Sequence, residues 1–252
     1  MIASQETRID FYKQFIDGFQ ILFDALENRV IEDGDGWQIR LTEWPSPLFN
    51  RVVIHSARPE AMVEVNAILE KHKAPVLINL VGGGLEHTKA LQDAGYTLRN
   101  TTPFMIWVTD DSQDNFALRD GLSVKHLDVS SLDVLKRIYK ESFGFGDDVI
   151  ELMGRILFAN PLAATYGLFK DDEIVSAVMA VKSEGDIGIW NMATPIAHQK
   201  HGYGEQLLRH VMKSYRGRGA EKLLLTSSPA GKALYDKCGW QTLDYLPTFI
   251  KS

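Results

Sequence analysis

The chain has 252 residues, of which 45% are hydrophobic and 24% are charged. These values are ordinary for a soluble globular protein, and the length suits one large domain or two small ones. The formal net charge of -6 and the pI of about 5.7 argue against non-specific nucleic-acid binding. The N-terminus lacks a secretory signal, and no apolar run approaches the roughly 18 residues that span a bilayer. We therefore expect a cytoplasmic protein that binds neither nucleic acid nor membranes.

Cysteine and histidine are sparse. Cys238 is the only cysteine, so no internal disulfide can form, and with no histidine near it in sequence we expect a structural thiol. The seven histidines form no HExxH pair and no Cys/His cluster, so we expect no metal site.

The first half mixes helices and strands. In chain order the expected elements are a helix at about 7–29, strands at 37–44 and 50–57, a helix at about 59–71, a strand at 75–81, a helix at about 86–93 and a strand at 102–108. Residues 109–121 are polar and acidic, which indicates a linker. We therefore predict one domain at 1–115 and a second at 116–252.

The second half has a similar mixture. Its expected elements are a strand at 122–127, helices at 131–143 and 147–159, strands at 164–170, 173–182 and 186–193, a helix from 204, a strand at 221–227, a helix at 230–238 and a strand at 242–251. The short turns between residues 164 and 193 favour antiparallel pairing. The pattern predicts an α/β (α+β) fold with helices packed on one sheet.

The ends of the two halves are alike. "HTKALQDAGYTLRNTTPFMIWV" from His87 and "AGKALYDKCGWQTLDYLPTFIK" from Ala230 share a short helix, a Gly-aromatic step and a closing strand. The match is short and needs a gap, so chance similarity is the alternative. If it is real, the chain holds two copies of one fold in tandem.

A glycine-containing loop, "QKHGYG" (Gln199 to Gly204), lies between a buried strand and an amphipathic helix. A helix N-terminus offers unpaired N–H groups and partial positive charge, which suit phosphate oxygens. Glycines allow close approach and positive φ, and Lys200 and His201 add charge. The alternative is that Gly202 and Gly204 only shape a turn. The dinucleotide fingerprint fails, because Leu207 occupies its third glycine position.

About thirty residues later, Leu234 and Tyr235 are followed by Gly239 and Trp240. With both motifs in this order, residues 122–251 resemble the GNAT superfamily of acyl-CoA N-acyltransferases. Its phosphate-binding signature R/Q-x-x-G-x-G/A is matched by Gln199, Gly202 and Gly204, and its later Leu-Tyr-x-x-x-Gly-Phe signature has Trp240 in the Phe place. The first half resembles a degenerate copy without the loop motif, so we expect one active site.

The resemblance implies a mixed, mostly antiparallel sheet flanked by helices, with acetyl-CoA as acyl donor. The cofactor-binding residues that it implies are Met192, Ala193 and Thr194 for the pantetheine arm and Gln199, Lys200, His201, Gly202, Tyr203 and Gly204 for the pyrophosphate. Ser228 stands where many members have Asn, which puts a side-chain bond to the cofactor in doubt.

In this superfamily an amine attacks the thioester directly. The resemblance implies that the backbone N–H of Thr194 polarises the carbonyl and that Tyr235 is the general acid for the departing thiolate. The alternative for Tyr235 is an ordinary core aromatic. The general base is open among several carboxylates, for each of which a solvated surface charge is the favoured interpretation: Glu141, Asp147, Asp148, Glu184 and Asp186.

The segment Glu141 to Asp148 corresponds to the border of the acceptor site in this superfamily. Phe143 and Phe145 suggest a partly apolar rim. Asp147 or Asp148 either attracts a cationic amine or serves as a helix N-cap, and the N-cap is the favoured interpretation. Strand alternation predicts that only one of Trp190 and Asn191 faces the acceptor.

Two rival interpretations remain. "APVLINLVGGGLEH" faintly resembles the turn of Rossmann-type methyltransferases, but His87 stands where a third glycine belongs. A non-catalytic acyl-CoA-binding sensor also fits the motifs. The acceptor is expected to be a small-molecule or peptide amine, and the chain a monomer or homodimer.

Overall fold

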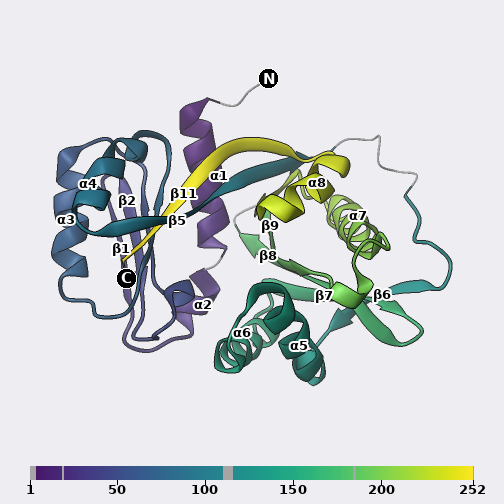
Figure 1. Cartoon of the computed structure of the whole chain (residues 1–252). Coiled ribbons are helices and arrows are strands. Elements are labelled where there is room, and N and C mark those ends of the chain that lie inside the picture. Colours follow the sequence, from purple (N-terminus) through teal and green to yellow (C-terminus); the bar gives the residue numbers. More distant parts are fainter. Residues whose placement is uncertain (1–3, 19, 110–115, 184–185, 252) are drawn as a thin grey trace. The chain divides into compact units, whose positions relative to one another are not determined.

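The computed structural model describes residues 4–18, 20–109, 116–183 and 186–251 (Figure 1). Residues 110–115 of the predicted linker and the candidate base Glu184 lie outside these ranges. The chain forms two compact units that are discontinuous in sequence. Unit 1 contains residues up to 13, residues 22–104 and residues from 243, and unit 2 contains residues 14–21 and 105–242. The division into domains at 1–115 and 116–252 stays a prediction.

Unit 1 contains a sheet with helices packed on it. Its elements are the first part of α1 (Gln5–Asp17), the last part of α2 (Gln20–Asp24), β1 (Val30–Gly34), β2 (Trp37–Leu41), β3 (Arg51–Ile54), α3 (Pro59–Leu69), β4 (Leu77–Leu80), α4 (Thr88–Asp93), the first part of β5 (Tyr96–Val108) and most of β11 (Gln241–Lys251), with short 3-10 turns at Pro47–Phe49 and Gly82–His87. The strand order is β1-β2-β3-β4-β11-β5. The pairs β1/β2, β2/β3 and β4/β11 are antiparallel, and β3/β4 is parallel.

The parallel strands of unit 1 stay paired to their ends. The register runs from Arg51↔Leu77 to Ile54↔Leu80, and the N–H of Val81 continues it by donating to the carbonyl of Ile54 at 2.9 Å. Gly84 lies so close that a Cβ there would stand 2.0 Å from the Ile54 carbonyl oxygen. The sheet is therefore closed between β3 and β4.

The last strand joins unit 1 through β4. Thr248 to Ile250 of β11 pair with Leu77 to Asn79. Inside this pairing, the buried Asn79 Nδ2 donates to Thr248 Oγ1 at 2.7 Å. The hydrogen bond satisfies the amide nitrogen, a donor that would be costly to bury without a partner.

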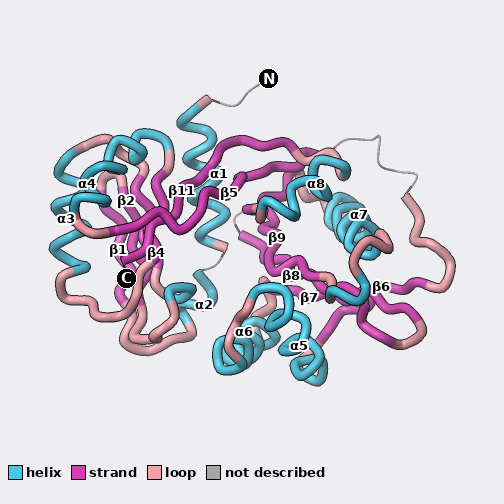
Figure 2. The backbone as a smooth tube through the Cα atoms, viewed as in Figure 1, coloured by secondary structure: helices cyan, strands magenta, loops and turns pink. Residues whose placement is uncertain are grey.

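Unit 2 has helices on both faces of its sheet (Figure 1, Figure 2). Its elements are β6 (Leu122–Leu127), α5 (Leu132–Phe143), α6 (Asp147–Ala159), β7 (Ala163–Lys170), β8 (Glu173–Ser183), β9 (Asp186–Ala193), α7 (Tyr203–Arg216), β10 (Lys222–Thr226) and α8 (Pro229–Lys237), with 3-10 turns at Val129–Ser131 and Ile196–His198. The strand order is β5-β10-β9-β8-β7-β6. β6 to β9 pair antiparallel, and β10 pairs parallel with β9. The predicted mixed, mostly antiparallel sheet is confirmed.

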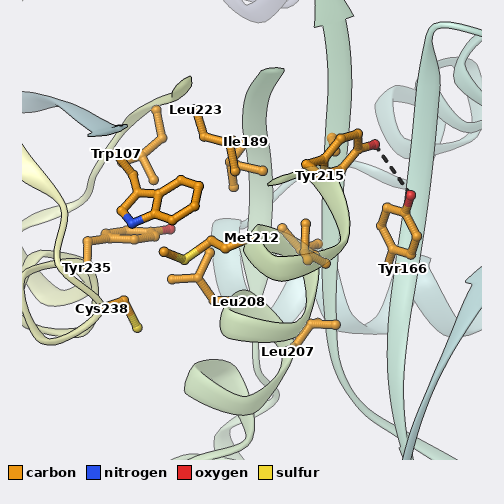
Figure 3. Close-up of a cluster of buried hydrophobic side chains, with 14 of the residues drawn as sticks. Trp107, Tyr166, Ile189, Leu207, Leu208, Met212, Tyr215, Leu223, Tyr235 and Cys238 are labelled. Carbon is orange, nitrogen blue, oxygen red and sulfur yellow. Dashed lines mark hydrogen bonds between the residues drawn. The ribbon is translucent and has the colours of Figure 1, made fainter. Parts of the chain in front are cut away.

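The helix α7 packs through a single apolar stripe. Leu207, Leu208 and Met212 are buried in a cluster with residues of β7 to β10 and α8 (Figure 3). At the end of the stripe, the Tyr166 and Tyr215 hydroxyls form a 3.4 Å hydrogen bond. On the other face of the sheet, α5 and α6 cover a separate cluster. Among the described residues, no helix is long and apolar enough to cross a membrane.

Candidate functional site

The parallel strands of unit 2 separate after two paired positions. Among the described residues, β9 and β10 pair at Ile187↔Leu223 and Gly188↔Leu224 alone. Beyond these two positions, β9 and β10 are no longer paired in the part of the chain that the structure describes. In unit 1, by contrast, the parallel strands β3 and β4 are paired along their whole length. Among the described residues, β10 therefore has no ladder pair with Met192 or Ala193 at the end of β9.

A β-bulge shapes the same strand. The register with β8 shifts between Met179↔Trp190 and Ala177↔Ala193, and Asn191 has a φ of +49°. A bulge bends its strand and redirects side chains. As a result, Trp190 and Asn191 both line one cavity, so the prediction that only one of them faces the site is wrong. The ring of Phe15 stacks on the Trp190 indole at 4.0 Å.

The cavity beside the separated strands has a volume of about 250 Å³. Its lining residues are Phe143, Ile189, Trp190, Asn191, Met192, Thr194, Thr226, Ser228, Gly231, Leu234 and Tyr235. Met192, Thr194, Ser228 and Tyr235 are residues that the sequence predicted for the site. Ala193 instead points its side chain into the cluster beneath α5.

Tyr235 is held at the cavity by the short helix α8. Ser228 caps this helix by accepting the N–H of Gly231 at 3.1 Å, and Pro229 occupies the first turn. Ser228 therefore has a structural role in addition to its place in the lining. The Tyr235 ring is buried and packs edge-on to Trp240 at 5.8 Å. Burial raises the pKa of Tyr235, so its phenol stays protonated at neutral pH.

The single cysteine, Cys238, is the C-cap of the same helix, α8. Cys238 is fully buried, and this burial raises the pKa of its thiol to about 11. A thiol with this pKa is protonated at neutral pH and therefore a poor nucleophile. The burial of Cys238 agrees with the structural role expected for it, which stays a prediction.

The loop Gln199 to Gly204 has the backbone of an anion-binding turn. Lys200 and Gly202 adopt positive φ values of +62° and +77°, and Gly202 is the N-cap of α7. Among the described residues, the N–H groups from Lys200 to Glu205 have no backbone hydrogen-bond acceptor. Left-handed residues and a helix start direct such N–H groups into a common concavity.

Gly204 permits the loop to approach β9. A Cβ at this position would lie 3.3 Å from Thr194 Oγ1 and 3.4 Å from Met192 Cε. Thr194 is fixed in turn by Ser176, whose hydroxyl donates to the Ala193 carbonyl and lies 2.9 Å from Thr194 Oγ1. The loop and the end of β9 therefore form one packed arrangement.

Side chains brace the loop. Gln199 Nε2 donates to the Thr194 carbonyl at 3.1 Å, and His201 Nδ1 lies 2.8 Å from the Gln199 carbonyl. These two side chains stabilise the loop itself, while that of Lys200 is exposed. The side chain of Tyr203 is buried and stacks with His201 at 5.6 Å.

Arg119 is a further residue at the loop, and no sequence motif indicated it. Its Nη2 donates to the His201 carbonyl at 2.8 Å, and its guanidinium lies 5.5 Å from the centre of the Tyr203 ring. It would be 3.7 Å from a Cβ on Gly202. Arg119 therefore brings a permanent positive charge to a loop whose signature position is the neutral Gln199.

The candidate bases do not gather at the cavity. Glu141 accepts the N–H of Ile196 at 2.6 Å, and Asp186 forms an ion pair with Lys222 at 3.1 Å. Burial raises the pKa of Asp186, an effect that Lys222 opposes. Neither carboxylate lines the cavity.

The two aspartates at the start of α6 also lie outside the lining of the cavity. Asp147 pairs with Lys140 at 3.3 Å. The helix N-cap is Gly146, with Asp147 and Asp148 in the first turn, so the predicted capping role of either aspartate is wrong. Their charges complement the helix dipole there. The chain reaches α6 through the left-handed Gly144, which sets the N-cap one residue earlier than expected.

The aromatic residues before α6 have different environments. Phe143 is 40% exposed and lines the cavity. Phe145 packs against the cluster beneath α5, and the two rings are 5.2 Å apart. Only Phe143 therefore belongs to the rim.

Comparisons with known proteins agree with this architecture. Residues 132–240 match the family model described as Acetyltransferase (GNAT) family. No curated protein matches the sequence. The GCN5-related N-acetyltransferase from Kribbella flavida has a TM-score of 0.70 and 13% identity, over 94% of this chain and 95% of that chain.

Two other solved structures are similar. A functionally unknown conserved protein from Staphylococcus epidermidis has a TM-score of 0.67 and 12% identity, over 90% of this chain and 96% of its own. The GCN5-related N-acetyltransferase from Sphaerobacter thermophilus has a TM-score of 0.60 and 13% identity, over 86% and 76%. At such identities the likeness shows the fold, while the family model identifies the domain. Residues 132–240 of this chain belong to the GNAT family of acetyltransferases.

Proposed function

We propose that unit 2 transfers an acetyl group from acetyl-CoA to a primary amine by direct attack. The observation that carries the proposal is the separation of β9 from β10, which opens a cavity onto Tyr235 beside an anion-binding loop. Acetyl-CoA would supply an activated acyl group as a thioester.

The residues around the cavity suit this donor. The N–H groups from Lys200 to Gly204 would hold the pyrophosphate, with Arg119 and Lys200 adding positive charge. The free edge of β9 at Met192 to Thr194 would pair with the amides of the pantetheine arm, as an added strand does.

Two groups would act on the reacting atoms. The backbone N–H of Thr194 has no hydrogen-bond partner among the described residues, and it would polarise the acyl carbonyl. Tyr235, whose raised pKa keeps its phenol protonated at neutral pH, would donate its proton to the departing sulfur.

The test is CoA release measured with a panel of primary amines. We expect turnover by the wild type, and Tyr235→Phe should bind CoA normally but turn over about 100-fold more slowly, since positioned general acids contribute roughly 10²–10⁴-fold. Equal turnover by both proteins, in single-turnover measurements, would exclude Tyr235 as the acid. Binding of CoA without turnover for any amine would favour the non-catalytic sensor.

Unit 1 is proposed to hold no donor site. Its parallel strands β3 and β4 are paired throughout, and Gly84 packs against the end of β3. Such a closed pair leaves no free strand edge for a pantetheine arm. Calorimetry should therefore find one CoA per chain, and two equivalent sites would contradict this.

A further inference from the structure

We propose that the acceptor is an α-amino carbonyl compound, such as an amino-acid amide or a peptide N-terminus, that enters the cavity as the uncharged amine. The inference rests on the proposed acyl transfer and names the substrate class of that site. Two observations carry it independently: the neutral lining of the cavity and the side chain of Asn191.

The cavity that contains Tyr235 is lined by neutral residues. Its polar groups come from hydroxyl, carboxamide and indole side chains, and Tyr235 itself is kept neutral by burial. The described carboxylates that the sequence offered as bases lie outside the lining, and Glu141, Asp147 and Asp186 have partners elsewhere. An ammonium group brought against these walls would lose water without gaining a counter-charge.

The reaction of a free amine keeps the cavity neutral. The amine nitrogen forms a bond to the acyl carbon, and the carbon–sulfur bond breaks with its electron pair moving to sulfur. The nitrogen loses one proton and the sulfur gains one, so a neutral amine and a thioester become a neutral amide and a thiol. The proton that makes an amine cationic must therefore be left in water before entry.

That requirement discriminates between amines by their basicity. At pH 7 a lysine-type amine with a pKa of about 10.4 is free in roughly one molecule in 2,500, and an α-amino group with a pKa of about 7.7 in roughly one in six. The ratio is about 400-fold. A less basic amine is a weaker nucleophile, which offsets part of this advantage, so we expect a net preference of at least about ten-fold.

The side chain of Asn191 is the reason for expecting a carbonyl group next to the acceptor amine. Its Nδ2 is buried and has no hydrogen-bond partner among the described residues. The residue lines both the reaction cavity and a smaller apolar cavity beneath α5 and α6. A buried amide donor without a partner is costly. Because this nitrogen has almost no accessible surface, a rotation of the side chain must turn it toward the reaction cavity, where a ligand oxygen would then satisfy it. A carbonyl next to an amine supplies this oxygen and also lowers the basicity of the amine.

The test uses one molecule with both kinds of amine. Alanyl-lysinamide is incubated with acetyl-CoA and the full chain at pH 7, and the acetylated nitrogen is identified by fragmentation mass spectrometry. We expect acetylation of the α-nitrogen over the ε-nitrogen by at least about ten-fold. Equal or preferred ε-acetylation would overturn the inference while leaving acyl transfer intact. Failure of every amine in the wider panel would refute acyl transfer and the inference with it.

The variant Asn191→Asp tests the second observation. Aspartate has nearly the same size and tolerates the left-handed backbone at this position, but it replaces the donor by a carboxylate. We expect the α/ε ratio to fall by about ten-fold or more, because a carboxylate repels the carbonyl and attracts an ammonium. A ratio within one molecule does not change when only the amount of folded enzyme changes. An unchanged ratio in a variant that unfolds at the wild-type temperature would remove Asn191 from acceptor recognition.

Discussion

Replacing Gly202 by alanine tests the assignment of the loop to the pyrophosphate. Gly202 has a φ of +77°, and the nearest atom to an added Cβ would be Arg119 Nη2 at 3.7 Å. There is room for the methyl group, so the substitution acts through the backbone alone. An L-residue in the left-handed region costs about 1–2 kcal/mol. The exposed loop can relieve this cost by relaxing, and its N–H groups then no longer converge.

Binding must restore the strained conformation. We therefore expect the Kd for CoA to rise about 5- to 30-fold, which is the same 1–2 kcal/mol expressed as affinity. Isothermal titration calorimetry measures this rise directly. Acetyl-pantetheine, which lacks the pyrophosphate, should bind Gly202→Ala and the wild type equally.

The chain offers a matched control in Gly219. Its φ is +86° and nothing lies within 4 Å of an added Cβ, but it follows the far end of α7. Gly219→Ala should lower the free energy of unfolding by about 1–2 kcal/mol and leave the Kd for CoA unchanged. If Gly202→Ala and Gly219→Ala bind CoA as the wild type does, the loop does not hold the pyrophosphate in the way we argue.

Three further substitutions test other parts of the molecule. Arg119→Gln should weaken CoA binding about ten-fold at low salt, and a difference that persists undiminished at high salt would contradict an electrostatic role. Gly188→Ala would place a Cβ 2.5 Å from Trp190 Nε1, so the displaced indole should raise the KM for the amine without altering CoA affinity, as steady-state kinetics and calorimetry would reveal. Thr248→Val leaves Asn79 Nδ2 buried without its partner and should lower the free energy of unfolding by about 1–3 kcal/mol in urea titrations. A stability within a few tenths of wild type would show that this hydrogen bond contributes nothing net.

Much of the fold follows from local patterns. The stripe of α7 and the antiparallel strands between residues 163 and 193 have strong periodicity and short turns, and their predicted bounds agree with the structure within a few residues. β1 was not predicted, because Val30–Gly34 is a mostly exposed polar edge strand without apolar alternation. The predicted helix at 7–29 is instead two helices separated near Gly18. The pairing of β11 with β4 depends on a register across the whole chain, which no local pattern contains.

The candidate site likewise has residues that the sequence predicts and residues that only the fold brings together. The loop from Gln199 and the short helix with Tyr235 are each contiguous in sequence, so the family resemblance alone could assign both to the site. Arg119 comes about eighty residues before the loop, and only the fold brings it there. Asn191 shares a cavity with Trp190 because a bulge breaks strand alternation, and bulges arise from the pairing of two strands.

The pairing of β11 with β4 also requires two strands that are synthesised at different times. Thr248 follows its partner Asn79 by 169 residues. At a synthesis rate of about 5–20 residues per second, roughly 10 to 30 s pass between the two leaving the ribosome. During this interval β4 has an open edge on the side that β11 later covers, and such an edge is prone to pair with other chains. Unit 1 is therefore completed only after β11 has been made, long after β4.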